Sequence, residues 1–221
     1  MSRSPMVDSL ERAVRAAGME LSGELMNSFV IFAQELKKWN HKINLTAITS
    51  DDEMSVKHFV DSLMLAQFLP DEGSLLDIGS GAGLPAIPVK LVKPRLEVMS
   101  VDAVGKKISF QRHAARVLGL KGFCAEHVRA EELAASLPNT FDVVVSRAFS
   151  CLELFAGLAR PLVRSGGRIV AMKGGGAHGE ADAAAERLAG MGLHCADVEL
   201  YSLPFGMGER GLVVLVPRNA A

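Results

Sequence analysis

The sequence predicts an α/β domain with a mostly parallel sheet, preceded by a cap of helices. From residue 74 onward, short runs rich in β-branched residues alternate with helical segments, which is the rhythm of βαβ units. The preceding segment shows helical periodicity instead. A glycine-rich turn follows the first short apolar run, at the place where such sheets bind ligands. We therefore expect a helical cap over residues 1–73 and a sheet domain over residues 74–221.

The cap is predicted to contain two amphipathic helices. Apolar side chains recur at spacings of three and four between residues 25 and 39, and the resulting stripe ends with Trp39. A second amphipathic segment covers residues 55–69 and stops at Pro70. The single tryptophan is therefore expected to pack in the apolar stripe, while the lysines around it face solvent.

The second part of the chain is predicted to alternate strands and helices. The expected strands before residue 174 are the first (74–78), the second (96–102), a third shortly before Ala130, the fourth (141–146) and the fifth (167–173). The expected helices cover residues 105–118, 151–163 and 178–191. Two further strands, 194–203 and 210–217, are joined by a short loop that contains Gly and Pro. These two are expected to pair antiparallel at the edge of the sheet.

Composition limits the class of protein. There is no stretch of about 18 apolar residues and no signal-peptide pattern at the start, so neither a membrane partner nor secretion is expected. The three cysteines lie far apart, which suits neither a disulfide framework nor a zinc site, and we expect a cytoplasmic protein without a metal. The net charge is −1, yet residues 90–129 hold nine basic and three acidic residues, so a local basic face remains compatible with a nucleic-acid partner.

The glycine-rich turn discriminates between two kinds of nucleotide cofactor. Gly79, Gly81 and Gly83 stand at alternate positions, and Leu84 occupies the place of the third glycine of a dinucleotide-binding motif. Asp77 lies two positions before the first glycine. This D-x-G-x-G-x-G pattern resembles motif I of class I S-adenosylmethionine-dependent methyltransferases, which are Rossmann-like proteins with a mostly parallel seven-stranded sheet and an antiparallel edge strand. The glycines would let the cofactor lie against the backbone, and the carboxylate would offset its positive charge.

Two acidic residues further along the chain fit the same cofactor. Asp102 ends the second predicted strand, where a carboxylate can accept hydrogen bonds from both ribose hydroxyls. NAD-binding proteins also use an acid at this point, so Asp102 alone does not discriminate. Ala130 and Glu131 follow the third strand, where a methyltransferase usually holds the adenine. For Glu131, an ordinary carboxylate at a helix start is an equally good explanation.

The end of the fourth strand, Ser146-Arg147-Ala148-Phe149, indicates the chemistry of the acceptor. It lacks the Asn/Asp-Pro-Pro-aromatic sequence of enzymes that methylate exocyclic amines. The three cysteines are more typical of core residues than of nucleophiles, which argues against methylation at C5 of a pyrimidine. A purine ring nitrogen such as guanine N7 needs neither deprotonation nor covalent activation. Catalysis would then consist mainly of alignment.

Seven segments together resemble the RsmG family, also called GidB, whose members are bacterial small-subunit (16S) ribosomal RNA methyltransferases that make N7-methylguanosine. The segments are KKWNHKINLTAI (37–48), HFVDSL (58–63), LLDIGSGAGLPAIPV (75–89), VDAVGKKISF (101–110), RAEEL (129–133), SRAF (146–149) and MKG (172–174). The resemblance runs from about residue 25 to the C-terminus, although the segment GMGERGLVVLVP diverges. It implies cofactor contacts at Gly79, Leu84, Asp102, Ala103, Val104, Ala130, Glu131 and Arg147.

Basic residues are candidates for holding the RNA. Arg147 ends a buried strand, where an unpaired charge would be costly, so it is expected to position the cofactor's carboxylate or the RNA. Lys173 ends the fifth strand on the same face and could take a phosphate, with an exposed loop lysine as the alternative. Further candidates for phosphate contacts are Lys37, Lys38, Lys42, Lys106 and Lys107.

Three other functions stay open at this point. A methyltransferase of the same fold that acts on a small molecule or a protein would suit the modest net charge. An NAD-dependent oxidoreductase is disfavoured by the missing third glycine. A non-catalytic assembly factor could bind both the cofactor and the small subunit.

Overall fold

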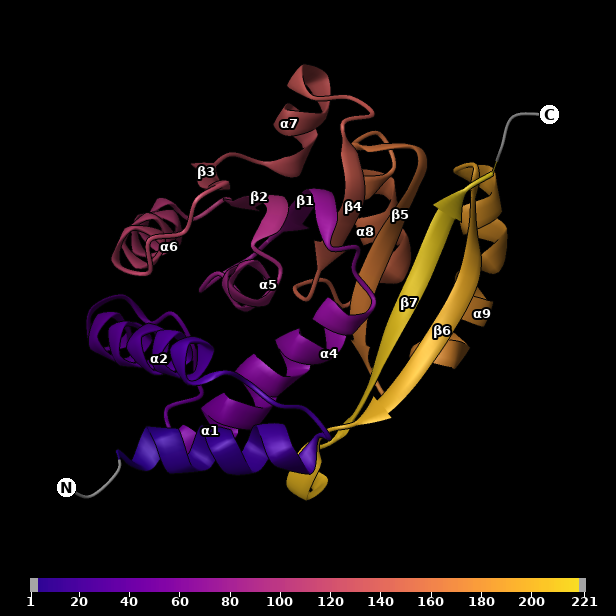
Figure 1. Cartoon of the computed structure of the whole chain (residues 1–221). Coiled ribbons are helices and arrows are strands. Elements are labelled where there is room, and N and C mark those ends of the chain that lie inside the picture. Colours follow the sequence, from indigo (N-terminus) through magenta and orange to yellow (C-terminus); the bar gives the residue numbers. More distant parts are fainter. Residues whose placement is uncertain (1–3, 219–221) are drawn as a thin grey trace.

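The computed structural model describes residues 4–218. A seven-stranded sheet, in the order β3-β2-β1-β4-β5-β7-β6, forms the centre and helices cover both of its faces (Figure 1). The strands are β1 (Glu72–Ile78), β2 (Arg95–Asp102), β3 (Phe123–His127), β4 (Phe141–Ser146), β5 (Val163–Gly174), β6 (Leu193–Ser202) and β7 (Glu209–Pro217). The first group of helical elements is α1 (Pro5–Ala16), α2 (Gly23–Ile43), α3 (Asp51–Met54), η1 (Ser55–Val60) and α4 (Asp61–Gln67). The remainder are α5 (Ala86–Val92), α6 (Gly105–Val117), α7 (Ala130–Ser136), α8 (Leu152–Ala159), α9 (Ala177–Gly190) and η2 (Pro204–Gly206).

The sheet topology confirms the predicted α/β class. Strands β1 to β5 pair in parallel, whereas β7 runs antiparallel to both β5 and β6. The antiparallel pairing of the last two strands is thus confirmed, with the added detail that β7 is inserted between β5 and β6. Strand β1 lies between β2 and β4, so the winding direction reverses there and a crevice opens beyond the carboxyl ends of these strands.

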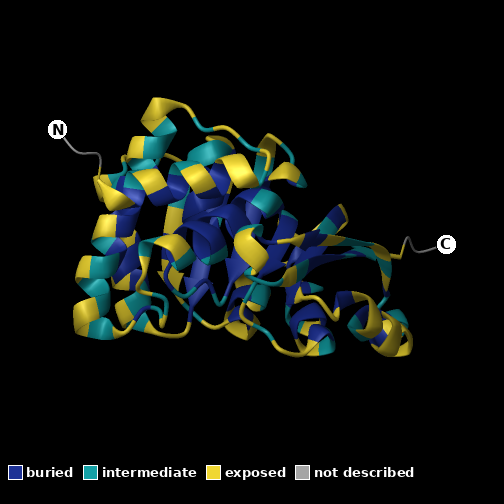
Figure 2. Cartoon of the chain, turned by 90° about the horizontal axis from the view of Figure 1, so that it is seen from below, coloured by how far each residue is buried: buried dark blue, intermediate teal, exposed yellow. Residues whose placement is uncertain are grey.

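Alternating side chains of the central strands build two hydrophobic layers. Leu75 and Val143 point into the layer under the cap, while the next residues, Leu76 and Val144, point into the layer under α8 and α9. All four are buried, as expected for parallel strands covered on both faces. Figure 2 shows the same arrangement, with buried strands inside and helices whose outer faces are exposed.

The cap packs on one face of the sheet domain through aromatic side chains. Phe29 and Phe32 of α2 both contact Phe59, with ring centroids 5.2 and 5.8 Å apart, and Phe32 also stacks on Phe110 of α6. Trp39 completes this stripe, with its ring centroid 5.7 Å from that of Phe110. The expectation that Trp39 belongs to the apolar face is confirmed, and the cap shares one continuous core with the sheet domain.

The second predicted cap helix departs from a regular α-helix. Residues 51–67 are continuously helical, but the middle stretch, η1, is a π-helix. Such turns hold one residue more than an α-helical turn and are frequent at functional sites. The apolar periodicity of residues 55–69 does not distinguish an α-helix from a short π-helix, because both place the apolar side chains on one buried face. The turn places Lys57 and His58 next to Asp61, the first residue of α4.

Candidate active site

The glycine loop has a backbone that side chains would disrupt. Gly79, Gly81 and Gly83 all have positive φ, at 72°, 59° and 75°. A Cβ atom on Gly79 would lie 2.9 Å from Cβ of Ala148, and one on Gly83 would lie 2.5 Å from Cδ1 of Ile87. A Cβ on Gly81 would meet no heavy atom within 4 Å, so space remains open beside this residue. Conformation thus requires all three glycines, and Gly81 in addition leaves room for a ligand.

Asp77 is a fully buried carboxyl group beneath this loop. Its Oδ2 accepts a hydrogen bond from the Ala86 N–H at 3.2 Å, at the start of α5. Its Oδ1 has no hydrogen-bond partner within residues 4–218. Burial raises the pKa of Asp77 to about 7. An orphaned buried oxygen of this kind is suited to a cationic ligand that enters the crevice.

Asp102 joins the glycine loop to the loop after β2. One carboxylate oxygen accepts from the Gly81 N–H at 2.9 Å and the other from the Val104 N–H at 2.8 Å. Lys107 also lies near, with Nζ 3.6 Å from Oδ2. Each carboxylate oxygen can accept a second hydrogen bond. That Asp102 also accepts hydrogen bonds from ribose hydroxyls is therefore kept as a proposal.

A glutamine that sequence reasoning missed also holds this loop. The buried Gln111, on α6, donates to Oγ of Ser80 at 2.8 Å and to the carbonyl of Gly81 at 2.9 Å. Its own Oε1 accepts from Oγ of Ser100 on β2. Glutamine at a buried helix position is a signal that could have been read, because buried amides are almost always hydrogen-bonded.

The glycine loop borders a cavity of about 180 Å³ whose other walls come from the cap and from the end of β4. The lining residues are Leu45, Thr46, His58, Gly79, Ser80, Gly81, Ala82, Leu84, Arg147 and Ala148. Four of the predicted cofactor contacts, Gly79, Gly81, Leu84 and Arg147, are therefore brought together here. Leu45, Thr46 and His58 are the residues that the cap contributes to this lining.

The remaining predicted cofactor residues surround the ends of β2 and β3. Ala103 and Val104 are exposed in the loop before α6, and the apolar Val104 side chain is 46% exposed. The ring of His127, at the end of β3, lies 3.0 Å from the carbonyl of Ala103 and so links this loop to the third strand. Ala130 is buried and Glu131 exposed at the start of α7. We propose cofactor contacts for Ala103, Val104, Ala130 and Glu131.

A second cavity, of about 330 Å³, adjoins the first at His58 and Arg147. It is lined by Ile48, Lys57, His58, Asp61, Arg147, Met172, Lys173, Gly174 and Arg210. Four of these side chains are cationic and one is anionic. We refer to it as the basic cavity.

The two residues expected to position the substrate both line the basic cavity, but they differ in their surroundings. Arg147 donates from one terminal nitrogen to the Lys57 carbonyl at 3.0 Å, and its side chain is 26% exposed. The ammonium of Lys173 is buried and donates to the carbonyls of Phe149 and Ser150 and to Glu180. Its three protons are thereby used inside the protein. Lys173 accordingly anchors the loop after β4, whereas Arg147 keeps donors for a ligand.

His58 is buried between the two cavities. Its Nε2 lies 2.9 Å from Oγ1 of Thr46. Asn40 fixes the Thr46 backbone, since its side chain donates to the Thr46 carbonyl at 2.9 Å and accepts from the Thr46 N–H at 2.8 Å. Burial, with a further contribution from the charge of Arg147, lowers the pKa of His58 to about 4, so the ring is neutral at pH 7. Asn40 and Thr46 of the WNHKINLT segment thus support His58 beside the site, and an RNA contact at Lys42 of the same segment stays a prediction.

Among the residues of the basic cavity or its support that were missed from the sequence are Asp61, Tyr201 and Arg210. They come from α4, β6 and β7, and Tyr201 donates to Asp61 over a sequence separation of 140 residues. A signal existed for Asp61, because an acid in the apolar HFVDSL segment is either exposed or paired. No comparable signal marks Tyr201 or Arg210.

The lysines expected to contact RNA lie on two helices, α2 and α6. Lys37 pairs with Asp51, Lys38 with Glu35 at 3.5 Å, and Lys107 lies near Asp102. Lys42 and Lys106 are exposed. These five stay proposals for the periphery of an RNA interface.

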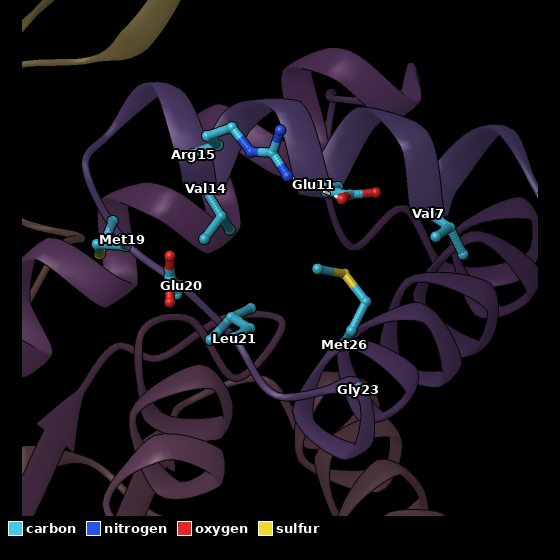
Figure 3. Close-up of a pocket in the computed structure, with 9 residues that line it drawn as sticks. All are labelled: Val7, Glu11, Val14, Arg15, Met19, Glu20, Leu21, Gly23 and Met26. Carbon is cyan, nitrogen blue, oxygen red and sulfur yellow. Dashed lines mark hydrogen bonds and ion pairs between the residues drawn. The ribbon is translucent and has the colours of Figure 1, made fainter.

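Other features of the described chain lie away from this site. A cavity of about 430 Å³ separates α1 from the start of α2 (Figure 3) and is lined by none of the residues discussed above. Its walls are Val7, Glu11, Val14, Arg15, Met19, Glu20, Leu21, Gly23 and Met26. Within residues 4–218 no group of three or more His, Cys, Asp or Glu side chains is placed to hold a metal ion. In the same residues no helix is long and apolar enough to cross a membrane.

The fold and the glycine loop define the class of protein. The structure is similar to TYW2 of M. jannaschii in complex with AdoMet, with a TM-score of 0.56, 14% identity and coverage of 72% of this chain and 74% of that one. It is also similar to a mutant 16S rRNA (adenine(1408)-N(1))-methyltransferase from Catenulisporales acidiphilia, with a TM-score of 0.56, 18% identity and coverage of 73% and 92%. The fold is that of class I methyltransferases, and S-adenosylmethionine is the cofactor. The orphaned oxygen of Asp77 and the open space at Gly81 fit that cofactor.

Sequence comparison identifies the family. The family model GidB, described as rRNA small subunit methyltransferase G, matches residues 25–202, and the chain belongs to this family. The Ribosomal RNA small subunit methyltransferase G of Geobacter sulfurreducens is 52% identical over 204 residues, which cover 92% of this chain and 94% of the relative. The protein of the same name from Myxococcus xanthus is 40% identical over 217 residues, with coverage of 97% and 98%. The resemblance drawn from the motifs is therefore confirmed.

Proposed function

We propose that the protein transfers a methyl group from S-adenosylmethionine to N7 of a guanine in 16S ribosomal RNA, within the small ribosomal subunit in the cytoplasm. The observation that carries this proposal is the adjacency of the two cavities. The glycine loop borders one cavity, the cationic side chains surround the other, and His58 and Arg147 belong to both. A cofactor in the first cavity and a nucleotide in the second would meet at these residues.

The side chains around the basic cavity suit an acceptor that needs no general base. Asp61 is the acidic residue among the lining side chains, and it already interacts with Tyr201 and two arginines. His58 is neutral at pH 7 and its Nε2 is paired with Thr46. Guanine N7 carries an in-plane lone pair that can accept the methyl group without losing a proton. The protein is then required to align the reactants, which can contribute up to roughly 7–11 kcal/mol.

The division of roles follows from the contacts. Bound S-adenosylmethionine supplies an electrophilic methyl group on a sulfonium centre. Asp102 and Gln111 hold the glycine loop in the shape that receives the cofactor. Asn40 and Thr46 support His58, and Lys173 holds the loop that carries Arg147. Arg147 directs positive charge into the basic cavity, where it can bind a phosphate or guanine O6 without occupying N7.

The proposal can be tested by methyl transfer from labelled S-adenosylmethionine to small subunits isolated from a strain that lacks this gene. Digestion to nucleosides and mass analysis then identify the product. We expect label in one 7-methylguanosine, and much less of it with the Asp102→Ala variant at the same cofactor concentration. Naked 16S RNA assayed in parallel reports whether the assembled subunit is required. Label in another nucleoside would refute N7. If the RNA stays unlabelled although calorimetry detects cofactor binding, 16S ribosomal RNA is not the methyl acceptor. Small molecules and proteins should then be tested as acceptors.

A further inference from the structure

Asp61 is a buried carboxylate at the meeting point of three separate parts of the chain. Its side chain is 3% exposed and it begins α4, directly after the π-helical turn. Oδ1 accepts a hydrogen bond from the Tyr201 hydroxyl of β6 at 2.8 Å. Burial, and next the charge of Asp61, raise the pKa of Tyr201 above its usual value, so the hydroxyl stays a donor.

Two guanidinium groups share this single carboxylate. Arg147, after β4, lies with one terminal nitrogen 3.5 Å from Oδ2 of Asp61. Arg210, on β7, lies with Nε 3.9 Å from Oδ1. The same two side chains also bond to main-chain carbonyls, Arg147 to Lys57 and Arg210 to the adjoining Glu209. Both guanidiniums are therefore held in place while parts of them stay exposed, at 26% and 29%.

The charges around the basic cavity do not balance. Lys57 pairs with Glu53 at 2.6 Å, and Lys173 pairs with Glu180 at 2.7 Å. Asp61 is the one carboxylate that forms ion pairs with Arg147 and Arg210 within residues 4–218, so two positive charges share one close negative charge, although the charge of Arg147 also acts on the more distant Asp77. Two guanidiniums fixed on one side by a buried acid present their free N–H groups to the other side. A phosphate, with one negative charge and several acceptor oxygens, matches this arrangement.

We propose that Asp61 is a positioning residue that holds Arg147 and Arg210 as a two-armed clamp for one RNA phosphate beside the target nucleotide. The inference rests on the proposed function and adds to it the group that orients the acceptor. Asp61 touches no substrate and acts through the two arginines. Because Tyr201 and Arg210 belong to β6 and β7, the edge hairpin becomes part of the acceptor site. Figure 1 shows this hairpin reaching towards the cap.

The clamp and its positioning residue can be separated with two kinds of variant. Arg210→Gln removes one cation, so the slope of log affinity for RNA against log salt concentration should fall by about 0.7–0.9, the value for one phosphate contact. Asp61→Asn removes an anion and leaves both cations, so this slope should not fall. It should nevertheless lower the single-turnover rate at saturating small subunits by roughly ten- to a hundredfold, because the arginines lose their orientation. S-adenosylmethionine affinity, measured by calorimetry, should stay unchanged in Arg210→Gln, because Arg210 does not line the cofactor cavity.

Matched controls keep the outcome interpretable. Lys121→Gln removes an exposed cation before β3, at the opposite end of the sheet order, and should leave both the salt slope and the rate unchanged. Tyr201→Phe keeps the ring and the charges but removes the hydroxyl donor to Asp61, so it should reduce the rate in the same sense as Asp61→Asn. If Asp61→Asn does not fold, Tyr201→Phe and Arg210→Gln decide the matter by themselves.

The proposal is overturned if Tyr201→Phe and a folded Asp61→Asn both transfer methyl groups at the wild-type rate. An unchanged salt slope in Arg210→Gln would equally exclude the phosphate contact. Failure of the wild-type protein to methylate small subunits is a different result, because it rejects the proposed function itself. A fall in cofactor affinity in Arg210→Gln would show that the arginine serves the cofactor instead of the RNA.

Discussion

The cofactor side and the acceptor side of this site are built in different ways. The cofactor side relies on residues that are close in sequence, with Asp77 and the three glycines within seven positions and Asp102 at the end of the next strand. The acceptor side joins Asp61, Arg147 and Arg210 from three distant segments. A local backbone shape can be encoded by a short motif, whereas a charge cluster depends on how the whole chain packs. The two sides should therefore respond to different substitutions.

The largest effect is expected from Asp102→Ala, which breaks the cofactor side alone. The substitution removes the acceptor of the Gly81 and Val104 N–H groups, together with the proposed ribose contacts. Hydrogen bonds to a charged group contribute about 1.5–3 kcal/mol each, so cofactor affinity should fall at least about a hundredfold. Calorimetry measures this, and filter binding should find RNA affinity unchanged. Wild-type cofactor affinity in this variant would contradict the assigned role.

Substitution of Asn40 should disturb the cap segment around Thr46 and leave the glycine loop in place. Asn40→Ala removes two hydrogen bonds to the Thr46 backbone and frees residues 44–49. We expect a loss of about 1–3 kcal/mol in the free energy of unfolding, measured by urea denaturation. We also expect the methyl-transfer rate to fall further than cofactor affinity, since Thr46 supports His58 between the two cavities. Equal losses of rate and affinity would mean that this cap segment serves the cofactor alone.

The buried acid under the glycine loop should make cofactor binding depend on pH. The pKa of Asp77 is raised to about 7 in the free protein, and a cationic cofactor favours the ionised form. Affinity should therefore rise with pH up to about 7 and then level off, with binding at pH 6 about tenfold weaker than at pH 8. Calorimetry at several pH values, with Asp77→Asn as the variant without the slope, tests this. A flat profile in the wild-type protein would show that Asp77 does not sense the cofactor.

The same raised pKa has the opposite effect on the stability of the free protein. Asp77 has a higher pKa when folded than its ordinary value of 3.8, so its protonated form is favoured by folding. This contribution is complete below pH 3.8 and is lost as pH rises through about 7. Saturating cofactor should reduce that loss, which thermal melting with and without the cofactor can measure.

The smallest effect is expected where the cap meets α6, outside both cavities. A hydrogen bond from His113 lowers the pKa of Glu35, whose Oε2 lies 2.5 Å from the imidazole Nε2. Stability from this pair is present above the ordinary pKa of about 4.5 and is lost as pH falls through the lowered value. Glu35→Gln should cost no more than about 1 kcal/mol in urea denaturation. A fall in the methyl-transfer rate that corresponds to more than about 1 kcal/mol would show that the packing of the cap on α6 affects catalysis.

The sequence predicts the glycine loop of the cofactor side for a physical reason. Gly79, Gly81 and Gly83 are needed for backbone angles that other residues rarely adopt, so the residue types themselves report the turn. The continuous apolar runs in β1 and β4 likewise indicate strands that are covered on both faces. What stayed hidden was the place of β7 between β5 and β6, because the pairing order of a hairpin with the sheet leaves no mark on the strand pattern.

The acceptor side was hidden because sequence does not show which charges are buried. The sequence left Lys173 as either a phosphate contact or an exposed loop lysine, yet its ammonium is engaged by three acceptors inside the protein. Lys90 contributes to the local excess of basic residues, but it is buried and donates to the carbonyls of Pro94 and Leu96. Arg210 lies beyond the residues that the family model matches, and it still reaches the site through the edge hairpin.

The insertion of β7 between β5 and β6 has a consequence for the order of folding. Strand β6 comes first in the chain, yet in the described sheet it is joined to the rest only through β7. Strand β6 can therefore join the sheet only by pairing with β7. Tyr201 and Arg210 are both carried by this hairpin, and both lie beside Asp61. A folding intermediate that lacks the hairpin would possess the whole glycine loop but no acceptor site, and could bind the methyl donor before it could use it.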